Sequence, residues 1–182
     1  MKRIISFVLF CTIIHGSSFA QVHFTKNGNI SFFSSALLED IKADNNQVIS
    51  VINTVNGEIQ FSLLNNAFHF KKALMEEHFN SDYIESAKYP KSGFKGTLTN
   101  VSSVNFGIDG TYSVTVSGNL NIHGITKTIT APGSITIRAG KITATSKFKI
   151  KPKDYNISIP ASVKNNIAEN IELTISCQYE KK

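Results

Sequence analysis

The chain has 182 residues, 41% of them hydrophobic and 18% charged, and it contains no block of polar low complexity. This size and composition predict one globular domain and exclude a disordered or repetitive protein. The formal net charge is +6, from 19 basic and 13 acidic residues. Without Lys2 and Arg3, 17 basic residues remain and the net charge falls to +4. Such a mild excess is only a weak indication of a nucleic-acid or acidic-membrane partner.

The first twenty residues have the pattern of a signal peptide. Lys2 and Arg3 precede the eleven-residue apolar run 4–14, and small residues from Gly16 onward lead to Ala20. That run is too short to cross a bilayer, which takes about 20 helical residues. We therefore predict a signal peptide at 1–20, a mature domain at 21–182 without an integral membrane segment, and a periplasmic or secreted location.

Cleavage after Ala20 would leave Cys177 as the one cysteine of the mature chain, since Cys11 lies within the leader. An oxidising compartment then has no intramolecular disulfide to form. We expect stability to come from the hydrophobic core, with Cys177 an inert thiol inside it.

Apolar and polar residues alternate with a period of two along most of 21–182, which predicts β-strands. In chain order, the alternating runs are 59–63, 68–70, 111–122, 135–137, 142–151 and 170–179. In the last run Ile171, Leu173, Ile175, Cys177 and Tyr179 share one face. Each run therefore has an apolar face that the fold has to bury.

Pairs of turn-forming residues separate the runs. These pairs are Asn56-Gly57, Asn65-Asn66, Asp109-Gly110, Pro132-Gly133 and Ala139-Gly140. Glycine and asparagine tolerate a positive φ and proline fixes a turn, so we expect hairpin connections at these places. Connections this short favour antiparallel neighbours.

One segment predicts a helix instead. In residues 73–79 and just beyond, Met75, Phe79 and Tyr83 recur at four-residue intervals and form an apolar stripe. Asn80-Ser81 is expected to break or recap this helix.

About eight strands and one short helical excursion predict an all-β fold, an eight-stranded antiparallel barrel whose closure leaves no exposed strand edges. A barrel of this size holds side chains or one ligand. The 13 Phe of the chain either line such a ligand cavity or fill the core, and composition leaves both open.

Several distinctive blocks of sequence follow one another along the chain: HFNSDYIESAKYP (78–90), Phe94, GNLNIHGITKTIT (118–130) and KDYNI (153–157). In this order they resemble the signatures of the YceI-like family of secreted lipid-binding proteins. Residues 30–61 also resemble the opening of members from Gram-negative bacteria of the Bacteroidetes type, with Leu37 where a proline is expected.

The resemblance implies a lipocalin-like barrel that is exported and holds a polyisoprenoid, quinone-like or other long-chain amphiphile, for transport or storage. It implies no catalytic residue, no metal and no cofactor. Dimers are common among proteins of this kind, although no residue pattern here demonstrates a homodimer.

Strand face and ring size indicate the candidate ligand-binding residues. For the tunnel wall they are Phe61, Phe68, Phe70, Met75, Phe79, Tyr112, Val114, Phe148 and Tyr155. Polar groups at the mouth of such a site orient a head group, and the candidates are His78, His123 and Lys127. The alternative for these three is an ordinary solvated surface.

Two other classes of function are weighed against a binding protein. An enzyme is not expected, because Glu76-Glu77-His78 lacks the spacing of a metal site and no nucleophile elbow, P-loop or dinucleotide fingerprint occurs. A small outer-membrane barrel also has eight strands, but the chain has no Trp for interfacial girdles and ends in Glu-Lys-Lys.

A polyanion binder is the third alternative. Lys147, Lys149, Lys151 and Lys153 form a basic stripe opposite Phe148. An exported protein meets little nucleic acid, and lysines on an edge strand discourage pairing with other chains. We therefore expect no nucleic-acid partner.

Overall fold

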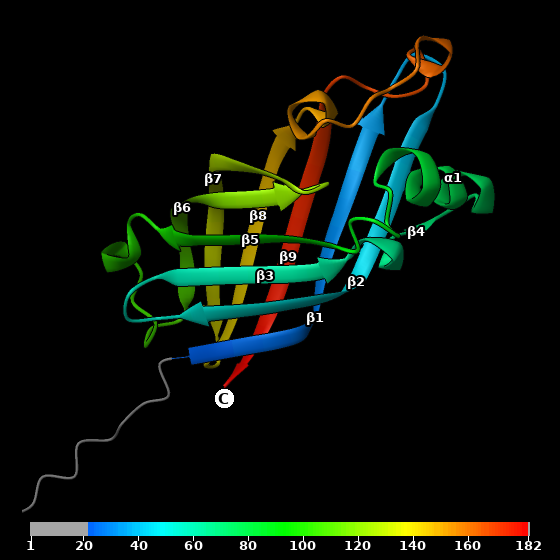
Figure 1. The fold of residues 1–182 in the computed structure, drawn as a ribbon. Helices are drawn as coiled ribbons and strands as arrows, with labels where there is room; N and C mark the ends of the chain where they lie inside the picture. Colours follow the sequence, from blue (N-terminus) through cyan, green and yellow to red (C-terminus); the bar gives the residue numbers. More distant parts are fainter. Residues whose placement is uncertain (1–21, 182) are drawn as a thin grey trace, which may run out of the picture.

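The computed structural model describes residues 22–181 (Figure 1), so the predicted signal peptide at 1–20 lies outside the described part of the chain. The strands are β1 (Val22–Ser35), β2 (Asp40–Asn53), β3 (Glu58–Leu64), β4 (His69–Phe70), β5 (Lys91–Leu98), β6 (Gly110–Ile122), β7 (Ile125–Arg138), β8 (Lys141–Ile150) and β9 (Ile171–Lys181). The helical segments are α1 (Ala73–His78), the π-helical turn η2 (Phe79–Tyr83) and the 3₁₀ turns η1 (Asn65–Ala67), η3 (Val101–Ser103), η4 (Pro152–Tyr155) and η5 (Ala161–Val163).

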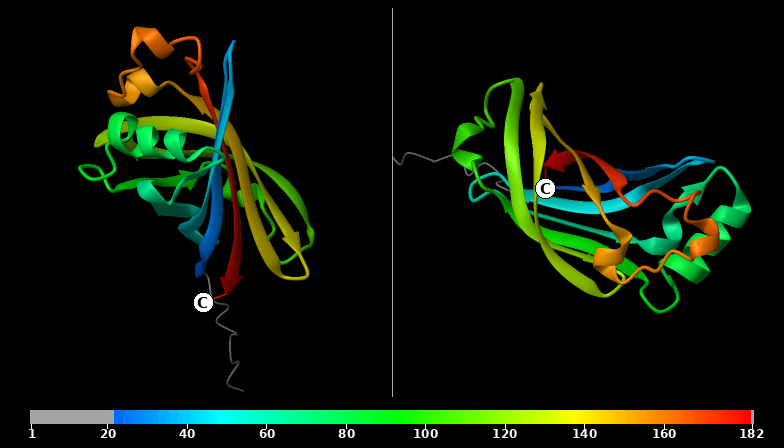
Figure 2. Two further views of the ribbon diagram at one scale, coloured as in Figure 1. Left: turned by 90° about the vertical axis from the view of Figure 1, so that its right-hand side faces the viewer. Right: turned by 90° about the horizontal axis from the view of Figure 1, so that it is seen from above.

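Eight of these strands close into an antiparallel barrel. Neighbours follow the order β1-β9-β8-β7-β6-β5-β3-β2, and β2 pairs with β1 to complete the ring. The two-residue strand β4 pairs with β2 at Ala43 and Asp44. Figure 2 shows the ring from above, with α1 and η5 at the same end. The predicted lipocalin-like, eight-stranded antiparallel barrel with one short helical excursion is confirmed.

The two described ends of the chain lie together at one end of the barrel. His23 of β1 pairs with Lys181 of β9. The turn between β1 and β2 lies at the opposite end (Figure 1). This arrangement gives the barrel two distinct ends.

The period-two alternation places apolar side chains inside the ring, as strand geometry requires. On β9, Ile171, Ile175, Cys177 and Tyr179 are buried, whereas Thr174 and the other alternate residues face outward. Strand β8 follows the same pattern, because Lys147 and Lys149 are exposed on either side of Phe148. The predicted apolar faces thus form the interior of the barrel.

The pair Pro132-Gly133 does not form the predicted turn. Both residues lie within β7, where Pro132 pairs with Thr115 of β6. Pairing of β7 with β8 begins only at Gly133, and the Pro132 carbonyl accepts a hydrogen bond from Ser146 Oγ at 2.7 Å. Pro132 has no N–H to donate, and it lies at the point where the β7–β8 hydrogen-bond ladder ends. A strand tolerates proline at such a position.

Beyond that point β7 and β8 separate. Residues 147–150 of β8 pair with β9 alone, so this half of β8 is a strand edge and carries the predicted lysine stripe. Lys147 pairs with Glu172 at 2.7 Å, and Lys153 and Lys151 lie 3.1 and 3.6 Å from Glu169. Those lysines, Lys153 first, lower the pKa of Glu169. The basic stripe is thus partly neutralised.

The predicted helix forms, but Asn80-Ser81 does not end it. The chain continues through η2 to Tyr83, where the Ile84 N–H bonds to the Phe79 carbonyl at 2.8 Å. Asn80 Nδ2 donates to the Glu76 carbonyl and Ser81 Oγ to the Glu77 carbonyl, at 2.9 and 3.0 Å. These side chains bond back into the preceding turn instead of capping it.

Among residues 22–181, none of the helices has the length and apolar character needed to span a bilayer.

Candidate functional site

The barrel encloses a cavity of about 290 Å³, here called the large cavity, at the end that carries α1 and η5. Its outermost lining residues are Glu39 before β2, His78 at the end of α1 and Asn166 after η5. His78 is exposed and Asn166 is half-buried. These three residues mark the mouth through which the cavity meets solvent.

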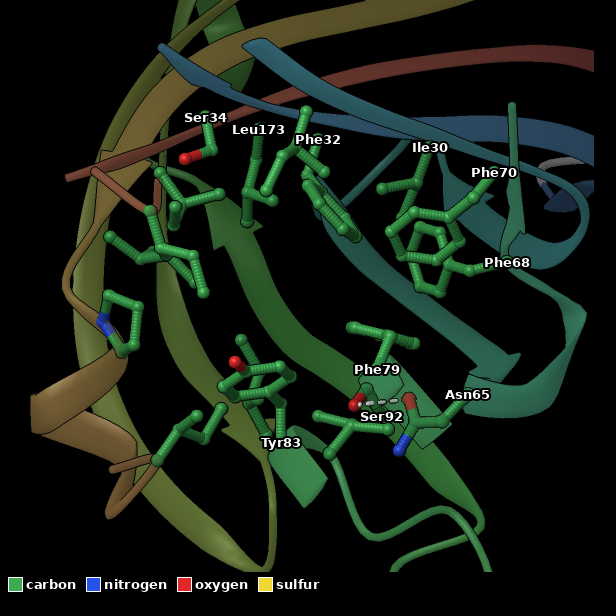
Figure 3. Close-up of a pocket in the computed structure, with 18 of the residues that line it drawn as sticks. Ile30, Phe32, Ser34, Asn65, Phe68, Phe70, Phe79, Tyr83, Ser92 and Leu173 are labelled. Atoms are coloured by element: carbon green, nitrogen blue, oxygen red, sulfur yellow. Dashed lines mark hydrogen bonds between the residues drawn. The ribbon is translucent and has the colours of Figure 1, made fainter. Parts of the chain in front are cut away.

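Four phenylalanine rings pack against one another along the wall of the large cavity (Figure 3). The centroid of the Phe79 ring lies 5.5 Å from Phe32, 5.6 Å from Phe68 and 5.2 Å from Phe70. The Phe32 centroid lies 5.5 Å from those of Phe68 and Phe70. Tilted and edge-on contacts at this spacing are the favoured geometry for aromatic side chains. The rings from β1, β4, η2 and the segment before β4 thus support each other without a ligand.

The helical stripe faces the same cavity. Met75, Phe79 and Tyr83 all line it, so the four-residue spacing seen in the sequence places one face of α1 and η2 over the barrel interior. Burial, with a smaller contribution from Asp82, raises the pKa of Tyr83. The phenol therefore stays neutral, and the stripe adds no charge to the wall.

Polar side chains in the wall are satisfied by the protein itself. Asn65 Nδ2 donates to the Tyr89 carbonyl at 2.6 Å, and Asn65 Oδ1 accepts from Ser92 Oγ at 2.8 Å (Figure 3). Ser34 Oγ accepts from the Ala168 N–H at 2.8 Å. Because these groups already form hydrogen bonds within the protein, they hold the wall in place and need no polar partner from a ligand in the cavity.

Ionisable groups gather instead at the mouth. Glu39 forms an ion pair with Lys72. Glu76 accepts from the Phe70 N–H at 3.1 Å and lies 3.6 Å from His69 Nδ1. The site therefore has an apolar interior and a charged rim, which is the arrangement of a pocket for an amphiphile.

A second cavity, of about 40 Å³ and here called the small cavity, lies toward the chain termini. Val114, Cys177 and Tyr179 are among its lining residues. We call the part of the barrel around it the closed half, and the part around the large cavity the mouth half. Burial raises the pKa of Cys177 to about 11 and also raises that of Tyr179, so both groups are neutral and unreactive near neutral pH.

Comparison with known proteins agrees with this architecture. A model of the YceI-like domain matches residues 10–179. The chain belongs to the YceI-like family. No curated protein sequence gives a significant match.

Solved structures give the same fold at low sequence identity. A polyisoprenoid-binding domain from Saccharophagus degradans, implicated in plant cell wall breakdown, matches with a TM-score of 0.76 and 16% identity over 90% of this chain and 99% of that one. BcnA from Burkholderia cenocepacia has a TM-score of 0.69 and 14% identity, covering 84% of this chain and 96% of its own. A YceI protein from Campylobacter jejuni has a TM-score of 0.57 and 17% identity, with both chains fully covered.

Most of the predicted wall residues of this YceI-like chain lie around the large cavity. Those that line it are Phe61, Phe68, Phe70, Met75, Phe79 and Phe148. Val114 lines only the small cavity. Tyr112 and Tyr155 line neither cavity. Tyr112 Oη donates to the Ile108 carbonyl at 3.1 Å, and Tyr155 is buried in η4 with a pKa that burial raises.

The three predicted head-group residues have three different environments. His78 lies at the mouth of the large cavity. Lys127 is exposed on β7 and lines neither cavity. His123 is 7% exposed and acts as a clamp, since its Nδ1 donates to the Tyr155 carbonyl at 3.0 Å and its Nε2 lies 2.6 Å from Glu85 Oε2.

Two parts of the wall are not predicted by the sequence patterns. Ile30 and Phe32 of β1 line the large cavity, as do Ile157, Ile159 and Ile167 before β9. The alternation Ile30-x-Phe32 was available as a signal, but the adjacent Phe33 obscured which face is apolar. Ile157-x-Ile159 also alternates, but Pro160 and the polar residues 164–166 interrupt the pattern before Ile167.

No cluster of His, Cys, Asp and Glu suitable for a metal ion occurs among the described residues. Inside the large cavity most lining groups are apolar, and the side chains of Asn65, Ser92 and Ser34 are hydrogen-bonded within the protein. What this geometry can do chemically is exclude water from an apolar chain.

Proposed function

We propose that this YceI-like protein is an exported binding protein that holds the apolar tail of a polyisoprenoid, quinone-like or other long-chain amphiphile in the large cavity, for transport or storage. The observation that carries the proposal is an apolar cavity of about 290 Å³ with its charged groups confined to the mouth. This volume is near the lower end of the range of roughly 300–1,000 Å³ found for small-molecule pockets.

Burial of the tail supplies the binding energy. Each methylene group removed from water contributes about 0.8 kcal/mol, before the costs of association and ordering are subtracted. About ten buried groups would contribute roughly 8 kcal/mol before those costs, so affinity should depend strongly on how many groups of the tail are buried. The head group would then lie near His78 and the Glu39–Lys72 pair. No chemical step on the ligand is proposed.

The fold of the Saccharophagus degradans domain, described as polyisoprenoid-binding, supports this choice of ligand class. The distribution of side chains argues against a membrane barrel, which carries its apolar band outside. Here the inward faces of β8 and β9 are apolar, and the outward faces carry Lys147, Lys149 and Thr174. Export and a periplasmic or secreted location are part of the proposal and rest on residues 1–20.

Native mass spectrometry of protein purified from its host tests the proposal. We expect a co-purified lipid, or uptake of a prenyl alcohol or quinone by stripped protein. Phe79→Gln should weaken uptake at least about tenfold, because it places an amide in the apolar wall. The matched control is Phe106→Gln, since Phe106 packs against the core and lines neither cavity. Absence of both lipid and uptake would contradict the proposal.

Cell fractionation and N-terminal sequencing test the location. We expect a soluble periplasmic or secreted protein that begins at Gln21. Recovery only with detergent would favour the outer-membrane alternative, and an uncleaved cytoplasmic chain would contradict export. Size-exclusion chromatography with light scattering tests the homodimer, which stays a prediction.

A further inference from the structure

The large and small cavities meet at a layer of three side chains. Phe61 of β3, Phe148 of β8 and Ile175 of β9 line both cavities. On each of these strands the residue two positions nearer the mouth lines the large cavity only, and the residue two positions nearer the chain termini lines the small cavity only. These flanking residues are Leu63, Ile150 and Leu173 on the mouth side and Ile59, Ser146 and Cys177 on the other.

Packing holds this layer in place on one side. The Phe61 ring stacks on Phe94, with centroids 5.1 Å apart and planes 22° apart. Phe94 is 4% exposed, and its ring lies over Gly96 and Gly118, where an added Cβ would come within 2.5 and 2.7 Å of Phe94 Cζ. Only glycine leaves room for the ring at these two positions, so Phe94 forms a fixed seat for Phe61.

Phe61 and Phe148 themselves are only half-buried, because each faces open volume on both sides. They are therefore the rings that separate the two cavities and have open volume on both sides, whereas Phe94 borders the small cavity alone. Removing either ring would join the cavities. The joined tunnel would extend along β9 from Ile171 to Tyr179, about 26 Å of strand at roughly 3.3 Å per residue.

The geometry points to Phe61 and Phe148 as the residues that set the length of tail this protein accepts. The inference rests on the proposed function and adds a specificity to it: the tail fills the large cavity and stops at the layer, and any further length remains outside the mouth. Affinity should therefore rise with tail length only until the large cavity is full.

A ladder of prenyl alcohols tests the inference. Binding of geraniol, farnesol, geranylgeraniol and solanesol to stripped protein is measured by displacement of a fluorescent fatty-acid probe. For the natural sequence we expect affinity to increase about tenfold or more per added isoprene unit and then to level off. In Phe148→Ala and Phe61→Ala the plateau should move to a longer alcohol, because the small cavity becomes available.

Two controls separate this effect from general loosening of the barrel. Phe106→Ala removes an equal ring from the core away from both cavities and should leave the plateau unchanged. Ala144→Leu, added to Phe148→Ala, fills the small cavity that Ala144 lines and should move the plateau back. Phe148→Leu and Phe61→Leu give smaller shifts in the same direction and serve where an alanine variant does not fold.

A plateau that is the same in the layer variants as in Phe106→Ala overturns the inference and leaves the proposed function standing. So does an affinity that keeps rising through solanesol in the natural sequence. If no alcohol of any length binds to the natural sequence, the proposed function fails, and this inference fails with it.

Discussion

The closed half and the mouth half are built from the same strands, with the same alternation, yet only one of them is filled. In the closed half β7 is hydrogen-bonded to both neighbours, and side chains leave a cavity of only about 40 Å³. In the mouth half β7 and β8 separate, and about 290 Å³ stays open. Alternation decides which side chains point inward, while strand pairing and ring placement decide whether they meet in the middle.

The largest difference between the halves should appear on removal of an inward isoleucine. Ile135 is 1% exposed in the closed half, and Ile150 is half-buried against the large cavity. In ligand-free protein Ile135→Ala should lower the free energy of unfolding by about 2–5 kcal/mol, because it leaves a void among packed neighbours. Ile150→Ala should cost about 1 kcal/mol or less, because its side chain already faces open space. Urea unfolding measures both losses. Equal losses would contradict the difference in packing between the two halves.

The two halves should also differ in how much a buried serine contributes to the free energy of unfolding. In the closed half Ser50 Oγ donates to the Gln60 carbonyl at 2.9 Å and accepts from Tyr179 Oη at 2.8 Å. Ser50→Ala leaves that phenol buried without a partner, and we expect a loss of about 1–3 kcal/mol in the free energy of unfolding. In the mouth half Ser34→Ala frees only the half-buried Ala168 N–H, which water can reach, and should cost less. A larger loss for Ser34→Ala would contradict this account.

A third substitution tests the end of the barrel at which β7 and β8 are not hydrogen-bonded to each other. His123 joins Glu85 to the Tyr155 carbonyl across the separated end of β7 and β8. His123→Ala should lower the free energy of unfolding by about 1–2 kcal/mol, with faster hydrogen exchange confined to the neighbourhood of η4. Lys127→Ala, two residues into β7 and exposed, is the matched control and should change neither quantity. Exchange that speeds up over the whole barrel would show that the clamp is not local.

The smallest effect depends on pH. The Cys177 thiol titrates at 9.0 in an unfolded chain and at about 11 in the folded one, because burial disfavours the thiolate. The folded pKa is raised, so this contribution to stability is complete below about pH 9 and is lost as the pH rises toward 11. By about pH 10 the loss is about 1 kcal/mol. Thermal unfolding from pH 7 to 10 should fall less steeply in Cys177→Ala, and an unchanged slope would contradict the assignment.

Much of this fold could be predicted from the sequence, because burial on one face of a strand leaves a period-two trace. The strands β6, β8 and β9, the barrel closure and the helical stripe of Met75, Phe79 and Tyr83 all follow from periodicity. The alternation does not say where along the barrel axis a side chain lies. For that reason the sequence predicts one wall for Phe148 and Val114, which both point inward. In the structure Phe148 lines both cavities, whereas Val114 lines only the small cavity.

The remaining differences come from context that a single strand does not contain. Pro132-Gly133 has the composition of a turn, and only the early end of the β7–β8 ladder lets it lie in a strand. His123 follows a strand in a turn segment that suggests exposure, but its two ring nitrogens are taken up by Tyr155 and Glu85. Both outcomes depend on residues about 14 to 38 positions away in the chain.

The pairing of His23 with Lys181 has a practical consequence for handling the molecule. An affinity handle or a surface tether fused at either end of the folded domain would project from the base of the barrel, on the side away from α1 and the turn between β1 and β2 (Figure 1). Immobilised protein would therefore present its opening to the solution, whichever end is attached.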